Sequence, residues 1–166
     1  MKRDSRVMRW AVVATLCLTT FAGAQVLSSD QLKKVIPNTF FFSGQVATVQ
    51  ARNSTGLKNS AGKLVLAGLV DTTGYATSIA EKFQGFLITD TKLSFGDRGA
   101  TLEPGCYGFG FKDGKLTVMN VAGTDLFSVA SQNDAQLKHP VPLKLEKSDT
   151  GYRLYAGRTY AAVKAD

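Results

Sequence analysis

Short runs of β-branched and aromatic residues, separated by turn residues, recur from Phe40 to the end of the chain. In Phe109–Val118, Asp113-Gly114 lies between two such runs, and this dipeptide supplies the positive φ angles of a tight hairpin turn. A second hairpin is predicted where Leu143–Lys147 meets Tyr152–Tyr155. Roughly seven to nine short strands, with no alternation of strands and helices, predict an all-β domain.

The spacing of apolar residues indicates how these strands are covered. Leu143 and Leu145 alternate with Lys144 and Glu146, as in an antiparallel sheet with one face in water. Lys63–Val70 is almost continuously apolar, which predicts a strand buried on both faces. We therefore expect a single antiparallel β-sandwich with Greek-key connections, or a small β-barrel.

One segment is informative about architecture. Leu102-Glu103-Pro104-Gly105-Cys106-Tyr107 resembles the segment that precedes a strand in fibronectin type III-like, transthyretin-like and related Greek-key sandwiches. The resemblance implies that the Tyr107 hydroxyl hydrogen-bonds to the backbone a few residues upstream. It indicates an architecture and carries no functional residues.

The first 24 residues have the pattern of a secretory signal peptide. A basic stretch is followed by an apolar run at 11–21 and by Ala22-Gly23-Ala24. A run of about 11 residues is short of the roughly 20 that a bilayer-spanning helix needs. We predict cleavage after Ala24 and export to the periplasm or the extracellular space. The alternatives are an uncleaved anchor and a lipidated Cys17, and bulky Leu16 disfavours the second.

The rest of the chain divides into an N-terminal helical segment, 25–39, and an all-β domain, 40–166. Ser28 or Ser29 is expected to cap a helix with Leu32, Val35 and Ile36 on one face, and Pro37 ends it. Further local predictions are a bent strand around Gly44, turns at 53–56 and 59–62, a helical turn with a capping box at 78–81 that ends at Gly85, and a loop or helical turn at 131–134.

The charge balance argues against nucleic acid as a partner. The full chain has a net charge of +7. Removing residues 1–24 takes away four of 20 basic and one of 13 acidic residues, which leaves a net charge of about +4. The remaining basic residues are scattered rather than concentrated in a patch. We expect no nucleic-acid partner and no transmembrane helix in the mature chain.

No catalytic or metal-binding constellation is evident. His139, the single histidine, precedes Pro140 and is predicted to lie in a surface loop. Cys106, the one cysteine after residue 24, is predicted to be a core thiol, with an intermolecular disulfide as the alternative. The aspartates stand singly near predicted turns, where they serve turn chemistry. We therefore assign no catalytic residue, metal ligand or cofactor, and an enzyme is disfavoured.

An aromatic row is the first candidate for ligand binding. Tyr107, Phe109 and Phe111 share one face of a predicted strand, opposite Cys106, Gly108 and Gly110. The favoured interpretation is that the rings belong to the core and that the glycines lie beneath a neighbouring aromatic ring. The alternative is that the rings form an apolar floor for a ligand.

The second candidate for binding lies near the C-terminus. Arg153, Tyr155 and Arg158 combine cations with an aromatic ring, a mixture that suits the recognition of sugars, carboxylates or a protein. The favoured alternative is structural: Arg153 forms a surface ion pair with an acid such as Glu146 across the hairpin.

The pattern as a whole predicts an exported, non-catalytic β-domain that acts by binding or as a structural component of the cell envelope. Its partner would be a protein, a glycan or a small apolar ligand. The alternatives are a carrier of a small apolar or glycan ligand, and a small outer-membrane β-barrel.

Overall fold

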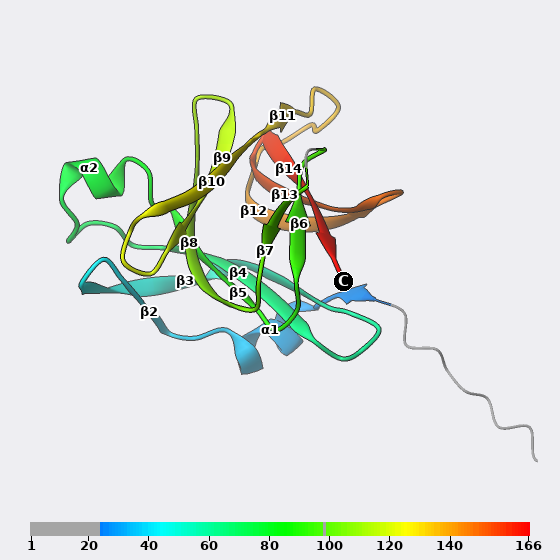
Figure 1. Cartoon of the computed structure of the whole chain (residues 1–166). Coiled ribbons are helices and arrows are strands. Elements are labelled where there is room, and N and C mark those ends of the chain that lie inside the picture. The colour runs from blue at the N-terminus through cyan, green and yellow to red at the C-terminus, as the bar shows by residue number, and fades with distance from the viewer. Residues whose placement is uncertain (1–23, 98) are drawn as a thin grey trace, which may run out of the picture.

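The computed structural model describes residues 24–97 and 99–166, and the predicted signal peptide lies outside them except for Ala24. Two antiparallel sheets pack face to face (Figure 1), so the predicted sandwich is confirmed. No helix in the described residues is long and apolar enough to cross a membrane.

The larger sheet has eight strands. Its order is β1 (Gln25–Val26), β3 (Gln45–Lys58), β4 (Leu64–Val70), β5 (Gly85–Thr89), β8 (Gly105–Lys112), β9 (Lys115–Asn120) and β10 (Asp125–Ala130), and β2 (Thr39–Phe42) also pairs with β3. The smaller sheet has six strands. Its order is β12 (Val141–Ser148), β13 (Gly151–Gly157), β14 (Thr159–Ala165), β6 (Leu93–Phe95) and β7 (Ala100–Leu102), and β11 (Gln132–Asn133) also pairs with β14.

The main core lies between the two sheets. Phe109 and Leu116 of the larger sheet belong to the same buried cluster as Phe95 and Leu154 of the smaller one, and Phe109, Leu116 and Phe95 have no exposed surface. The sandwich is therefore filled by its own side chains at this level.

The outer face of the larger sheet has a second core. The Phe42 ring of the β2–β3 hairpin stacks on Phe83, with ring centroids 3.8 Å apart. Two helices add to this cluster: Leu32 of α1 (Ser29–Val35) and Ile79 of α2 (Thr77–Ala80) pack against it. The larger sheet is thus covered on both faces.

This double cover explains the apolar run at Lys63–Val70. In β4, Val65 and Ala67 face the core between the sheets, whereas Leu66 and Val70 belong to the outer cluster. The prediction of a strand buried on both faces is confirmed.

Both predicted hairpins are confirmed. Asp113 and Gly114 have φ angles of 51° and 70° and join β8 to β9. In the β12–β13 hairpin, Leu143 and Leu145 are buried and Lys144 is exposed. Period two in the sequence therefore matches the buried face of β12.

The predicted corner hydrogen bond is also present. The Tyr107 hydroxyl donates to the Glu103 carbonyl oxygen at 2.8 Å. This bond fixes the connection between β7 and β8 where the chain passes from the smaller sheet to the larger.

Helix α1 follows its sequence signals closely. Ser28 is the N-cap residue, and with Gln31 it forms a capping box. Leu32 and Ile36 pack against the outer cluster as predicted. Val35 is exposed instead, because the side of this short helix that contacts the cluster includes Leu32 and Ile36 but not Val35.

Two turn predictions need correction. Ser43 and Gly44, at φ 49° and 81°, form a hairpin turn between β2 and β3, so the predicted bent strand is two strands. The predicted turn at 53–56 lies within β3, because burial of Thr55 and Gly56 against neighbouring strands overrides the turn propensity of these residues. The turn at 59–62 is confirmed, and the Asn59 side chain accepts two backbone N–H bonds there.

The helical turn predicted at 78–81 is present as α2, but its predicted cap and end, and the loop or helical turn predicted at 131–134, are wrong. Helix α2 begins at Thr77 after Ala76 and has no side-chain cap, and Gly85 is the first residue of β5. Gln132 and Asn133 form the short strand β11, because Thr159 and Tyr160 of β14 offer them an edge to pair with.

Candidate functional site

The predicted aromatic row belongs mainly to the core. Phe109 is fully buried between the sheets, and Tyr107 and Phe111 pack against the same cluster. On the opposite face, the Phe42 ring covers Gly108, and the Lys82 carbonyl group lies against Gly110. The structural interpretation of this row is therefore confirmed, and the enclosed Phe109 ring is not available to a ligand.

The predicted C-terminal binding residues make internal contacts. The Arg153 guanidinium lies over the Tyr160 ring, 4.6 Å from its centroid. Glu146 lies opposite Arg153 in the ladder, but among the described residues its carboxylate is paired with Lys144 at 3.1 Å. The predicted ion pair between Arg153 and Glu146 is wrong, because the neighbouring aromatic face attracts the guanidinium instead.

Tyr155 and Arg158 form hydrogen bonds to the segment before β12. Tyr155 is only 2% exposed, and its hydroxyl donates to the Asp134 carboxylate at 2.8 Å. Arg158 donates to the carbonyl oxygens of Leu137 and of Lys138, the second at 3.0 Å. These side chains therefore attach residues 134–138 to the smaller sheet.

The Tyr155 contact also shifts two pKa values. Burial raises the pKa of Tyr155, so its hydroxyl keeps its proton and acts as the donor. That hydroxyl, more than the Gln136 backbone N–H, lowers the pKa of Asp134 below its usual value. The Asp134 carboxylate is thus favoured in its charged form by this contact.

The remaining candidates for chemistry lie apart on the surface. Cys106 is exposed, so the predicted core thiol is wrong: the Phe42 ring covers Gly108, and Cys106 lies beyond that cover. His139 is exposed in a loop, as predicted. Among residues 24–97 and 99–166, no group of three or more histidine, cysteine or acidic side chains is placed to hold a metal ion.

A different feature emerges at the side of the sandwich where β10 ends the larger sheet. A hollow of about 480 Å³ lies between β10 and the start of the β6–β7 turn. We call this hollow the edge slot. Most of its lining residues are small, namely Gly96, Ala100, Ser128, Ala130 and Ala162.

The walls of the edge slot are close to each other at its base. The Phe95 and Phe127 rings are tilted against one another, with centroids 5.5 Å apart. Val129 lies beside Gly96, where an added Cβ would be 3.4 Å from the Val129 Cβ. Val129 and Gly96 therefore approach each other within the lining of the slot, beside the contact between the Phe95 and Phe127 rings.

The hydrogen-bond register shows which groups of β10 face this slot. The Ser131 N–H donates to the Gly114 carbonyl oxygen at 2.9 Å, which identifies this opposed pair as hydrogen-bonded. Because hydrogen-bonded pairs alternate along an antiparallel ladder, Ser128 and Ala130 are not bonded to β9. Their N–H and C=O groups point away from β9, on the free edge that lines the slot. Among the described residues, no hydrogen bond to these four groups is found.

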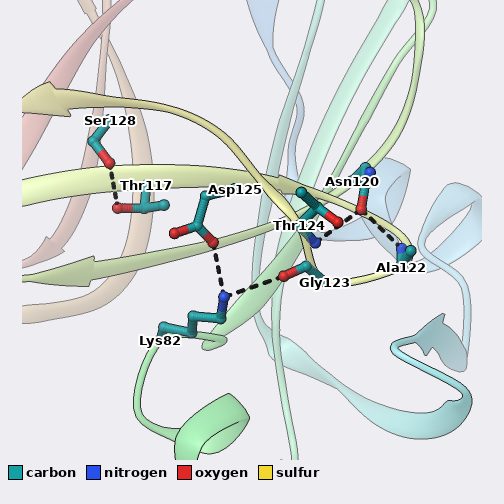
Figure 2. A network of polar contacts seen from close by, with 8 residues as sticks. All are labelled: Lys82, Thr117, Asn120, Ala122, Gly123, Thr124, Asp125 and Ser128. Atoms are coloured by element: carbon teal, nitrogen blue, oxygen red, sulfur yellow. Dashed lines mark hydrogen bonds and ion pairs between the residues drawn. The ribbon is translucent and has the colours of Figure 1, made fainter.

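Side-chain contacts hold β10 in place without using that edge. Figure 2 shows Lys82 bonded to the Gly123 carbonyl oxygen at 3.1 Å and to the Asp125 carboxylate at 2.8 Å. Further along the strand, the Ser128 and Thr117 hydroxyls are 2.8 Å apart. The strand is therefore anchored at its start and against β9, while the outward main-chain groups of Ser128 and Ala130 have no hydrogen-bond partner in the part of the chain that the structure describes.

The described residues that line the slot are mostly uncharged. Asp97 is the one ionisable residue among them, and the Gln132 side chain already accepts a bond from the Tyr160 hydroxyl at 2.6 Å. The slot is suited to binding main chain with small, largely uncharged side chains.

The sequence prediction missed this site. Leu126-Phe127-Ser128-Val129-Ala130 has the alternation of a strand, but alternation does not reveal whether the strand has one neighbour or two. The small residues that line the slot come from four separate segments, which only the fold brings together.

Comparison with known proteins adds no relative: no family model, no curated protein and no solved structure matches this chain.

Proposed function

We propose that this protein is an exported, non-catalytic binding domain that captures an extended segment of another protein in the edge slot. The bound segment adds a strand to β10. The observation that carries the proposal is the row of main-chain groups at Ser128 and Ala130, to which residues 24–97 and 99–166 make no hydrogen bond, on the wall of a hollow of about 480 Å³.

Strand addition fits the chemistry of the slot. An extended peptide that lies antiparallel or parallel to β10 meets two outward N–H groups and two outward carbonyl groups, and main-chain hydrogen bonds give affinity in this binding mode. The small side chains at Gly96, Ala100 and Ala162 allow a second backbone to approach. The volume lies in the range of ordinary ligand sites.

The slot also implies a preference among peptides. Small, uncharged residues suit its lining, and Asp97 at one end favours a lysine or arginine near the corresponding end of the segment. A charged residue in the middle of the segment would be desolvated without a partner and would weaken binding.

The carrier hypothesis has less support. It required a pocket lined by Tyr107, Phe109 and Phe111, whereas the Phe109 ring fills the core and none of the three lines the edge slot. The proposal of export rests on the pattern of residues 1–24 in the sequence.

The test uses linear peptides selected on the purified protein from a random 12-residue display library. The best peptide is resynthesised with a methyl group on one backbone nitrogen at a time. Strand addition predicts that methylation at alternate positions abolishes binding, because only alternate N–H groups face β10. Uniform tolerance of methylation would contradict the proposal.

The protein side of the test is a pair of variants at one position. Ser128→Pro removes an outward N–H but no ladder bond, so the peptide should bind at least about tenfold more weakly while the fold persists. Ser128→Ala keeps the N–H and removes only the hydroxyl, so it should bind like the wild type. Equal binding by all three proteins would place the peptide elsewhere and refute the proposed site.

A further inference from the structure

The β2–β3 hairpin presents an apolar face to solvent. Phe41 and Val46 are 55% and 65% exposed, which are the two highest values among the large hydrophobic residues described as exposed. They lie directly opposite each other in the hairpin. The neighbouring opposed pair, Thr39 and Thr48, is exposed on the same face.

This face carries no charge. Between Lys34 and Arg52 the sequence has no acidic or basic residue. Exposed edge strands ordinarily carry lysine or proline, which prevent pairing with another chain. β2 has neither, and an exposed aromatic side chain stands in its middle.

The edge of β2 also has main-chain groups to which no described residue forms a hydrogen bond. Val49 donates its N–H to the Asn38 carbonyl oxygen at 2.9 Å, so the hydrogen-bonded pairs include Asn38 and then every second residue of β2. The main-chain groups of Thr39 and Phe41 therefore point away from β3. The next outward N–H, that of Ser43, donates to the Val121 carbonyl oxygen at 2.8 Å, which marks where the free edge ends.

We infer that β2 is the contact between two copies of this chain, joined edge to edge about a twofold axis at Phe40. In that arrangement Thr39 of each copy faces Phe41 of the other. Each such pair exchanges two main-chain bonds, since outward-facing residues become the hydrogen-bonded pairs of the new ladder. Two large sheets then merge into one, with Phe41 and Val46 of both copies on a common face.

The lack of charge at the β2 edge suits a second copy as the occupant. The chain has a net charge of +7 in full and about +4 without residues 1–24, so two copies repel each other overall and a neutral edge is where they can meet. At the uncharged β2 edge they meet without bringing like charges together. The edge is also self-complementary under a twofold axis, which is the symmetry of most homodimers.

Sedimentation equilibrium of the purified protein tests this contact. The wild type should show a reversible monomer–dimer equilibrium within the range of about 1–100 µM, because the contact is small. Phe41→Lys should weaken the dimer at least about tenfold by bringing two like charges together. Thr39→Pro, which removes one outward N–H from each copy, should weaken it as well.

Val35→Lys is the matched control, since it places the same charge on another exposed hydrophobic residue, 38% exposed in α1. It should dimerise like the wild type. A wild type that remains monomeric at 100 µM, or a dimer that Phe41→Lys leaves unchanged, would overturn the inference. Ser128→Pro should leave the dimer intact, and Phe41→Lys should leave peptide binding intact, so failure of one proposal is distinguishable from failure of the other.

Discussion

The two long sides of the sandwich differ in whether the outward main-chain groups of their edge strand are hydrogen-bonded. On one side β12 is the last strand of its sheet, and its outward Leu145 N–H donates to the buried Thr55 hydroxyl of β3 at 3.0 Å. On the other side the outward groups of Ser128 and Ala130 in β10 line the edge slot. One side is closed by a hydrogen bond between the sheets, and the other is left able to accept one.

The side chains of the two edge strands follow the same division. β12 carries Pro142, Lys144 and Lys147, all exposed, which are residues that discourage pairing with another chain. β10 has no charge or proline after Asp125. Residues that discourage pairing with another chain thus lie on the edge strand β12, and β10, for which we propose a function, lacks them after Asp125.

The largest expected effect is a difference in stability between core substitutions on the two sides. Leu145→Ala removes a side chain that is 4% exposed in the core, and should lower the free energy of unfolding by about 2–5 kcal/mol. Val129→Ala, at a half-buried position on the open side, should cost about 1 kcal/mol. Urea denaturation measures both, and equal losses would contradict the division into a closed and an open side.

A pair of prolines tests the register of β10. Val129→Pro removes a ladder bond to β9 and should cost about 3 kcal/mol or more. Ser128→Pro, one residue earlier, removes only an outward N–H and should cost less than about 1 kcal/mol. A larger loss of stability for Ser128→Pro than for Val129→Pro would contradict this register, because the Ser128 N–H would then be the one bonded to β9.

The interstrand bond on the closed side has a smaller expected effect. Thr55→Val keeps the shape of the side chain but leaves the Leu145 N–H buried without an acceptor, which should cost about 1–3 kcal/mol. Thr55→Ser retains the hydroxyl and serves as the control. Wild-type stability for Thr55→Val would show that the closed side does not depend on this bond.

The smallest effect concerns the segment that connects the two sides. The Tyr155 hydroxyl lowers the pKa of Asp134, so the contact stabilises the fold above the ordinary aspartate pKa of about 3.9 and loses this contribution as the pH falls through the lowered value. Below pH 4 the wild type should therefore lose slightly more stability than Asp134→Asn, which has no proton to gain. Parallel acid titration curves for the two proteins would contradict this role.

Local sequence signals predicted the parts of the fold that depend on a few adjacent residues. Asp113-Gly114 predicted its hairpin, and the resemblance of Leu102–Tyr107 to a Greek-key corner segment implied the corner hydrogen bond. The alternation of Leu143 and Leu145 with polar residues predicted the buried face of β12. In each case the causes lie within a few residues of the effect.

The candidate sites depend on contacts between segments that are far apart in the sequence, and local sequence patterns do not predict such contacts. Phe41 lies between two buried phenylalanines in the sequence, and only its place in a hairpin layered over the larger sheet makes it exposed. The sequence predicts that Arg153 pairs with the acid opposite it, but the Arg153 guanidinium lies over the ring of Tyr160 in the next strand instead. Ser128 became a site residue only because no strand follows β10 in its sheet.

Amide hydrogen exchange by NMR tests the open edge most directly. In the free protein the Ser128 and Ala130 amides should exchange on the order of 100-fold faster than those of Phe127 and Val129 in the same strand, while the capped Leu145 amide exchanges slowly. On adding the selected peptide, Ser128 and Ala130 should become as protected as their neighbours. Slow exchange at Ser128 and Ala130 in the free protein would mean that their N–H groups are already bonded, and strand addition to β10 would be contradicted.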